Sequence, residues 1–462
     1  MTRLKEQQTA ATASRYRPAI QILILMAGKS SAPWARFKPR PFFVNILTME
    51  FNFSKIKTKS GVPLWVLPMP SSNIVSAGVL IKAGTRDEEW PKEAGIAHAL
   101  EHMFFQGTEK FPTSKNVSGY IEEVGGNLNA WTLKEMTFYH AHVPSDHKNR
   151  AVHIISEQIR KSVFPEEKIA VEMKNIIQEI RRRNDDHQRN VGYLSDQFLY
   201  GNHPLSKDTL GIEESVIGFK KENFISFRDR YYNPSNFVFI TAGGITAEEA
   251  LNLFNENFPE EIKLKSNIHK PRPLSYVGDK VNIKKKDIEQ IHLILSAATG
   301  EAKSKETIYL GIFRDMISGG MSFPLFQEVR DKKGLCYSIW AGLRPWSDVG
   351  KFSIYIGTDP KRYKEAITTS LEVVDKSKND EGLLEKVKQL AIGKLAFKFE
   401  TSSKIISNAA IDIAFLDFPR GYNEILKDIK ETTINDIKQA VDKYLKPEMF
   451  YTIILAPKDF IL

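Results

Sequence analysis

The sequence predicts two similar α+β domains, and three of its features lead to this fold class. The chain has 462 residues, which is too long for one ordinary domain. Two of its segments recur at an offset of about 213 residues. Each half also begins with strand-like patterns, continues with amphipathic helical patterns and closes with an apolar strand, the order expected of an α+β domain.

The repeat is visible in two pairs of segments. Residues 231–237, Tyr-Tyr-Asn-Pro-Ser-Asn-Phe, precede an apolar run, and residues 444–450, Tyr-Leu-Lys-Pro-Glu-Met-Phe, precede another. The apolar segment 77–84 is matched at almost the same offset by 291–298. We therefore expect a basic extension at 1–48, a first domain at 49–257, a linker rich in Pro and Lys at 258–280, and a second domain at 281–462.

Individual elements can be predicted within this frame. Residues 75–83 and 290–298 are rich in Val, Ile and Leu and are bounded by turn residues, which is typical of strands. Residues 165–183 begin with Pro, carry two acids in the first turn and Arg in the last, which predicts a helix.

Composition excludes several classes of protein. Hydrophobic residues make up 42% and charged residues 26%, as in ordinary globular domains. The longest apolar run, residues 22–27, is far shorter than the roughly 18 residues of a membrane span. The single cysteine, Cys336, can form neither an internal disulfide nor a cysteine metal cluster. Any bound metal must therefore be held by His, Asp or Glu.

The net charge of +9 is concentrated at the N-terminus. Residues 1–48 contain eight Lys or Arg and one acid, Glu6, so the rest of the chain carries a formal charge of only +2. Such a balance gives no support to nucleic-acid binding. The segment itself fits a targeting sequence, a disordered tail, or translated upstream sequence with the true start at Met49, and we favour the last interpretation.

The motif His98-Ala-Leu-Glu101-His102 carries the clearest chemistry. On a helix, residues four apart share a face, so both imidazoles can bind one metal ion with Glu101 beside them. Two imidazoles and a carboxylate leave a fourth position for water, as catalytic zinc requires. The predicted helix 165–183 offers two carboxylates, Glu172 and Glu179, on an otherwise apolar face, where a carboxylate is expected to be paired or bound to metal.

These residues resemble the signature of the pitrilysin/insulinase (M16) family of zinc peptidases, in the short two-domain type that includes the mitochondrial processing peptidase subunits. The signature is His-x-x-Glu-His, 76 residues and a Glu, which is Glu179 here. Further similar segments are Gly84-Thr-Arg-Asp-Glu88, Gly125-Gly126, Asn129-Ala-Trp-Thr132, Glu135-Met-Thr137, Tyr200-Gly-Asn-His-Pro-Leu205, Gly319-Gly-Met321, Leu325-Phe-Gln-Glu-Val-Arg330 and Gly334-Leu-Cys-Tyr337.

The resemblance implies specific roles. His98, His102 and Glu179 would bind one Zn²⁺ per chain, Glu101 would be the general base, and Glu172 would support the site from behind the ligands. A set of four residues, Asn129, Ala130, Arg330 and Tyr337, would contact the peptide substrate, the first two through a free strand edge. His140 and His142 are expected to be ordinary strand histidines rather than a second metal site.

The two halves are not expected to be equivalent. The repeat places Gly311, Arg314 and Asp315 where His98, Glu101 and His102 stand, so the second half should be non-catalytic. Short members of the family form a chamber by pairing two chains, which implies a homodimer or a heterodimer with a related chain.

The sequence thus predicts a zinc metalloendopeptidase that hydrolyses extended or unfolded peptides by metal-activated water. A presequence-processing peptidase is an alternative, and a non-catalytic structural subunit is another, although the latter would be expected to lack some of the ligands. The lone thiol favours a reducing compartment, so we expect the cytoplasm, or the mitochondrial matrix or export if residues 1–48 are a targeting segment.

Overall fold

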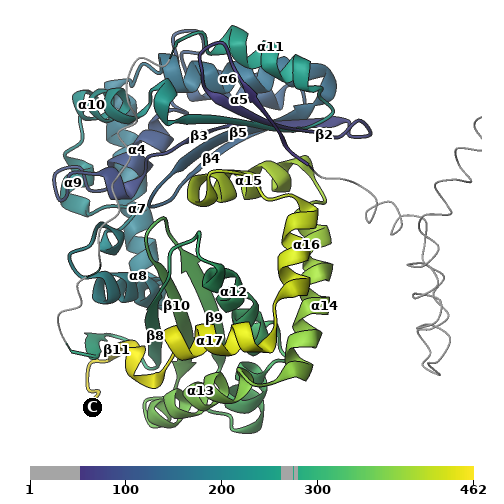
Figure 1. Ribbon diagram of the computed structural model, residues 1–462. Helices are drawn as coiled ribbons and strands as arrows, with labels where there is room; N and C mark the ends of the chain where they lie inside the picture. The colour runs from purple at the N-terminus through teal and green to yellow at the C-terminus, as the bar shows by residue number, and fades with distance from the viewer. Residues whose placement is uncertain (1–51, 262–273, 275–278, 462) are drawn as a thin grey trace, which may run out of the picture. The chain divides into compact units, whose positions relative to one another are not determined.

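The structure of the chain is a computed structural model that describes residues 52–261, 274 and 279–461 (Figure 1). The predicted extension at 1–48 and most of the predicted linker at 258–280 lie outside the described residues. No helix in the described ranges is long and apolar enough to cross a membrane.

The first half forms a six-stranded sheet with helices on both faces. Its elements are β1 Ser54–Lys57, β2 Pro63–Pro68, β3 Ile74–Ile81, η2 Thr85–Asp87, α4 Ile96–Met103, α5 Ser114–Glu122, β4 Asn127–Thr132, β5 Thr137–Pro144, η3 Ser145–His147, α6 Lys148–Lys161, α7 Glu166–Asp185, α8 His187–Tyr200, η4 Pro204–Ser206, α9 Glu213–Ile217, α10 Lys221–Tyr231, η5 Pro234–Asn236, β6 Phe237–Gly243 and α11 Ala247–Asn257. The strand order is β1-β2-β6-β3-β5-β4, so β4 is an edge strand.

The second half repeats this arrangement around a five-stranded sheet. Its elements are β7 Val281–Lys286, β8 Ile291–Thr299, α12 Lys305–Ser318, η6 Leu325–Lys332, β9 Ser338–Pro345, β10 Gly350–Thr358, α13 Tyr363–Ser377, α14 Glu381–Lys398, α15 Ser402–Leu416, α16 Tyr422–Glu431, α17 Ile434–Tyr444, η7 Pro447–Met449 and β11 Tyr451–Pro457. The prediction of two α+β domains is confirmed.

The two sheets have the same topology, as expected of a repeat. The order β7-β11-β8-β10-β9 reproduces β2-β6-β3-β5-β4 strand by strand. In both sheets the first of these pairs is parallel and the others are antiparallel. The fourth and fifth strands form a hairpin in each half, so β9 occupies in the second sheet the edge position that β4 has in the first.

One helix of each half packs against the sheet of the other half. Helix α8 of the first half packs on β8 and β11, while α15 of the second half packs on β3 and β6 (Figure 1). Strand β3 is therefore covered on both faces, which explains why its sequence is a continuous apolar run rather than an alternating one. Val75, Ala77, Val79 and Ile81 face the core of the first half, and Leu80 faces α15.

Buried ion pairs also join the halves. The Arg86 guanidinium, on η2, contacts Glu135 in the turn between β4 and β5 and Asp348 in the turn between β9 and β10. In the same way Lys351 on β10 pairs with Asp196 on α8. All five side chains are at most 8% exposed. Within the described unit, helix packing and buried ion pairs thus hold the two halves together.

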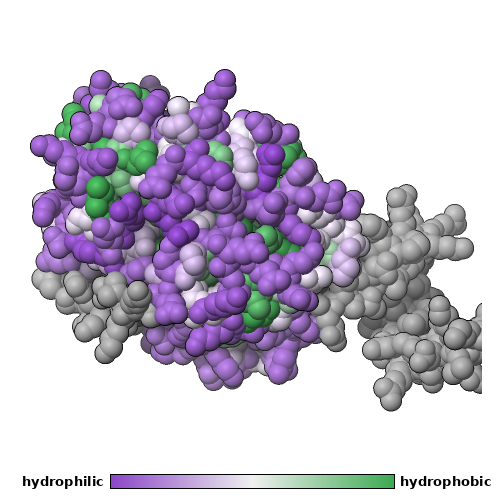
Figure 2. All heavy atoms as spheres, turned by 90° about the horizontal axis from the view of Figure 1, so that it is seen from above, coloured by the Kyte–Doolittle hydropathy of each residue, from purple (hydrophilic) through white to green (hydrophobic). Residues whose placement is uncertain are grey.

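The surface facing away from this junction is mainly polar. Viewed from the side of α6 and α11, hydrophilic residues dominate and hydrophobic ones lie in small separate groups (Figure 2). Scattered apolar side chains of this kind are normal for a folded protein and need no binding partner to explain them.

Candidate metal centre

Helix α4 presents the histidine motif, and its start is fixed by two local features. The helix begins after Gly95, whose φ of 93° lies in the left-handed region that favours glycine. The Glu88 carboxylate accepts hydrogen bonds from the backbone N–H groups of Gly95 at 3.0 Å and Ala97 at 3.1 Å. Two of the amides that a helix start leaves without a partner are thus satisfied, which orients the helix that carries His98 and His102.

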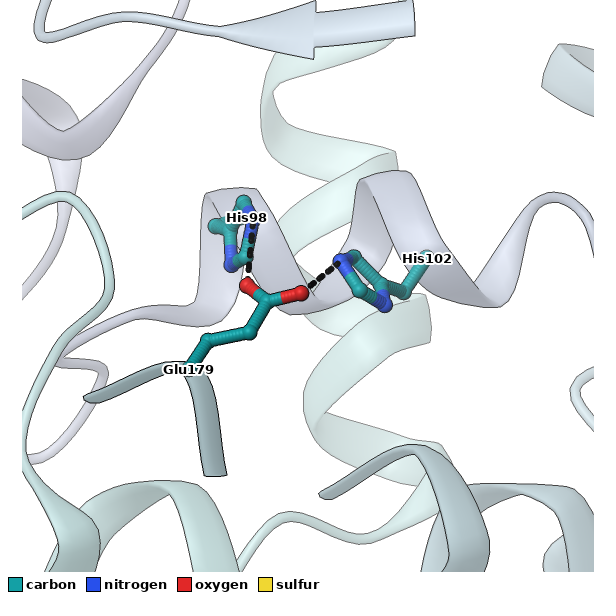
Figure 3. Close-up of side chains that lie close together, drawn as sticks. All are labelled: His98, His102 and Glu179. Carbon is teal, nitrogen blue, oxygen red and sulfur yellow. Dashed lines mark ion pairs between the residues drawn. The ribbon is translucent and has the colours of Figure 1, made fainter. Parts of the chain in front are cut away.

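Two imidazoles from α4 and one carboxylate from α7 converge on a single point (Figure 3). His98 Nε2 lies 3.7 Å from Glu179 Oε2, and His102 Nε2 lies 3.9 Å from Glu179 Oε1. One donor atom from each of these three residues lies within 4.8 Å of the other two. Ligands about 2.0–2.1 Å from a tetrahedral ion are roughly 3.3 Å apart, so the three side chains need only a small movement to hold one.

Glu172 approaches the same centre from the opposite side of His102. Its Oε2 lies 3.1 Å from His102 Nδ1, which leaves the Nε2 of that ring directed at Glu179. A carboxylate on the outer nitrogen of a metal-binding histidine fixes the orientation of the ring and increases its basicity. The structure thus brings Glu172 together with the three candidate ligands.

The charges at the centre suit cation binding. Burial, assisted by the nearby His102, lowers the pKa of His98 to about 3, so this ring is neutral and free to bind a cation. Burial also lowers the pKa of His102, but the hydrogen bond to Glu172 and the surrounding carboxylates outweigh that effect and raise it. His98 Nδ1 is buried without a hydrogen-bond partner, so Nε2, which faces Glu179, is the ring nitrogen available to a cation.

Glu101 lies beside the centre, held by a residue of the edge strand. The Thr132 hydroxyl, at the end of β4, donates a hydrogen bond to Glu101 Oε2. Burial raises the pKa of Glu101, while this hydrogen bond opposes the rise. A carboxyl group with a raised pKa that is fixed beside a metal centre is suited to accept and return a proton. Thr132 belongs to the motif 129–132, but no pattern in the sequence predicts its contact with Glu101.

Among the residues that the structure describes, the equivalent region of the second half has no such cluster of His and Glu side chains. Gly311, Arg314 and Asp315 lie on α12, where Asp315 forms an ion pair with Arg314 at 2.9 Å. Lys394 on α14 lies 3.7 Å from Asp315. An arginine thus stands at the position that carries the Glu101 carboxylate in the first half.

The four predicted substrate contacts lie in two places. Asn129 and Ala130 are on β4, whose outer edge pairs with no strand among the described residues. The Ala130 N–H is already bonded, at 2.8 Å, to the Asn129 side-chain oxygen. Arg330 lies in the last turn of η6 with its guanidinium over the Phe326 ring, and Tyr337 precedes β9 and is 41% exposed.

Two family models match the chain. Residues 67–212 match the model described as Insulinase (Peptidase family M16), and residues 218–390 match the one described as Peptidase M16 inactive domain. The first match contains the candidate metal centre. The description of the second agrees with the substitutions found on α12.

Whole-chain relatives exist in bacteria. A protein of Rickettsia felis that is named an uncharacterized zinc protease is 32% identical over 423 residues, which is 89% of this chain and 99% of the relative. A Bacillus subtilis protein with the same designation is 28% identical over 404 residues, covering 86% of this chain and 97% of its own.

Solved structures share the fold at lower identity. A protease from Helicobacter pylori superposes with a TM-score of 0.79 at 21% identity, covering 88% of this chain and all of its own. A Pseudomonas fluorescens structure described as a peptidase M16 inactive domain gives 0.80 at 16% identity, covering 88% and 98%.

Proposed function

Because this chain belongs to the M16 (insulinase) family of peptidases, in its short two-domain form, we propose that it is a zinc-dependent endopeptidase that cleaves extended peptides. The observation that carries the proposal is the convergence of His98, His102 and Glu179 with Glu101 beside them. Nitrogen and oxygen donors in a set of three, with room for a fourth ligand, are typical of catalytic rather than structural zinc sites.

His98 and His102, through their Nε2 atoms, and Glu179 would hold the ion, and Glu172 would keep the His102 ring in place. A bound zinc ion supplies a Lewis acid that lowers the pKa of a water molecule to about 7 and polarises a carbonyl group. The remaining chemistry belongs to the side chains of the chain itself.

Glu101 is proposed as the general base and then the general acid. Its carboxylate takes the proton of the attacking water and returns it to the leaving amine, so no bond to the enzyme forms. The raised pKa of Glu101 favours the first step, in which the carboxylate takes up a proton, and the Thr132 hydroxyl holds the carboxylate by a hydrogen bond. β4, which carries Thr132, has an outer edge that pairs with no strand in the described ranges, and an extended peptide would join this edge by backbone pairing.

We propose Asn129 and Ala130 as the contacts on that edge, and Arg330 and Tyr337 as contacts supplied by the second half. Because one half has a complete centre and the other does not, one zinc ion per chain is proposed. A pair of chains, identical or related, is proposed to enclose the substrate, since the family's short members work in that form.

The test is cleavage of a quenched fluorescent peptide of about 20 residues by the full chain, with Glu101→Gln and, as a control, Gln178→Ala at an exposed position of α7. The parent and the control should cleave and bind one zinc per chain, while Glu101→Gln should bind zinc without cleaving. Zinc without cleavage in the parent would favour a non-catalytic subunit, and absence of zinc from every form would reject the site.

A further inference from the structure

Tyr337 combines exposure with tight fixation. It is one of the large apolar side chains that the described part of the chain leaves exposed, at 41%. Exposed side chains usually exchange between rotamers, but this ring lies across Gly357 on the neighbouring strand β10. A Cβ atom added at Gly357 would stand 2.6 Å from the Tyr337 Cζ and Oη atoms. Only glycine leaves room for the ring in this position.

Hydrogen bonds hold the hydroxyl end of the same ring. The Tyr337 N–H donates to the Gly357 carbonyl oxygen at 3.0 Å, which fixes the backbone below the ring. The Tyr337 hydroxyl is hydrogen-bonded to that of Tyr355, a fully buried residue of β10. Tyr355 Oη lies in turn 2.8 Å from His292 Nδ1, and Tyr337 Oη lies 3.4 Å from His292 Nε2.

Further aromatic rings pack against the residues behind this contact. Trp340 stacks on the Tyr355 ring with centroids 5.5 Å apart, and the His187 ring meets His292 edge-on at 5.3 Å. Burial, together with His187, lowers the pKa of His292 to about 4, so the imidazole is neutral near pH 7 and has one nitrogen able to accept a hydrogen bond.

We propose that Gly357, Tyr355 and His292 are positioning residues that hold Tyr337 ready to contact the backbone of a bound peptide. A hydroxyl has one donor and two acceptor positions, and its contacts with Tyr355 and His292 leave one acceptor position for a peptide N–H. The ring supplies apolar contact area as well. Holding the side chain in place before binding removes the cost of ordering it, which strengthens binding. The inference rests on the proposed peptidase function for the choice of ligand.

The test measures the dissociation constant of a fluorescein-labelled peptide of about 20 residues for zinc-loaded, full-length Glu101→Gln protein, which should bind without cleaving. Tyr355→Phe removes one hydroxyl but keeps the buried ring, and Gly357→Ala displaces Tyr337. Each should weaken binding roughly 3- to 10-fold, the effect of leaving one side chain unordered. Gly393→Ala, where an added Cβ meets nothing within 4 Å, should leave binding unchanged.

A double substitution separates positioning from general structural damage. If Tyr355 acts through Tyr337, then Tyr355→Phe should have no further effect in a Tyr337→Ala background. An equal loss with and without Tyr337, or no loss in Tyr355→Phe and Gly357→Ala proteins that melt like the parent, would overturn the inference. Peptide that binds and responds as expected but is not cleaved by the parent would refute the proposed function alone, whereas a peptide that does not bind at all would refute both.

Discussion

The support that Glu172 gives to His102 leads to a quantitative prediction about metal affinity. Glu172 Oε2 is 3.1 Å from His102 Nδ1, and the Glu172 side chain is only 13% exposed, so water cannot easily replace its carboxylate. The hydrogen bond from His102 is the main reason that the pKa of Glu172 is lowered. Both observations indicate a charge-assisted hydrogen bond rather than a loose surface contact.

Substitution of Glu172 by Ala should therefore weaken zinc binding without removing a ligand. Loss of the carboxylate behind a ligating histidine typically reduces metal affinity 10- to 100-fold, which corresponds to about 1.4–2.7 kcal/mol. Glu172→Gln, which keeps a neutral oxygen acceptor, should lose less. Glu167→Ala makes the same chemical change on an exposed position of α7 and serves as the control.

The assay is competition for zinc between the metal-free full chain and a chromophoric chelator at pH 7.5. Expected affinities decrease in the order parent and Glu167→Ala, Glu172→Gln, Glu172→Ala, with His102→Ala weakest because it lacks a ligand. Equal affinity of Glu172→Ala and parent, alongside a large loss in His102→Ala, would show that the Glu172 contact does not support the metal.

Two further predictions concern stability. Burial lowers the pKa of His140 and His142 to about 4 on β5, where His142 also contacts Ser403 of α15. Unfolded histidines titrate near pH 6.5, so between pH 6.5 and 4 the unfolded chain binds more protons than the folded chain. The unfolding free energy should therefore decrease as the pH is lowered through this range, by up to about 1.4 kcal/mol per pH unit for each histidine. Urea denaturation of His142→Asn at several pH values should show a weaker dependence on pH, and an unchanged dependence would contradict this prediction. Arg86→Ala leaves Glu135 and Asp348 buried without their cation, so it should cost about 3–5 kcal/mol by urea unfolding, and a loss below 1 kcal/mol would argue against the ion pair.

The parts of the centre that follow helical periodicity could be predicted from the sequence. His98, Glu101 and His102 share one short helix, so their spacing alone indicates that the two imidazoles lie on a common face. Glu172 and Glu179 are two turns apart on α7 and likewise face one way. The resemblance to a peptidase family then related these two helices to each other.

Contacts between distant segments could not be predicted in this way. Nothing in the composition of α8 or α15 indicates that each packs on the sheet of the other half, because an amphipathic pattern shows that a face is buried but not against what. Thr132 reaches Glu101 only because the β4–β5 hairpin places the strand end beside α4. The need for glycine at position 357 likewise depends on the Tyr337 ring that lies across it, and no local sequence pattern predicts this contact.

The most direct test of the metal centre is an anomalous difference map at the zinc absorption edge, from crystals of the full-length Glu101→Gln protein grown with zinc and an uncleaved peptide. The account predicts one strong peak per chain, about 2.0–2.2 Å from His98 Nε2, His102 Nε2 and a Glu179 oxygen, and none beside Asp315 in the second half. A peak at another place, or no peak with zinc in excess, would contradict it.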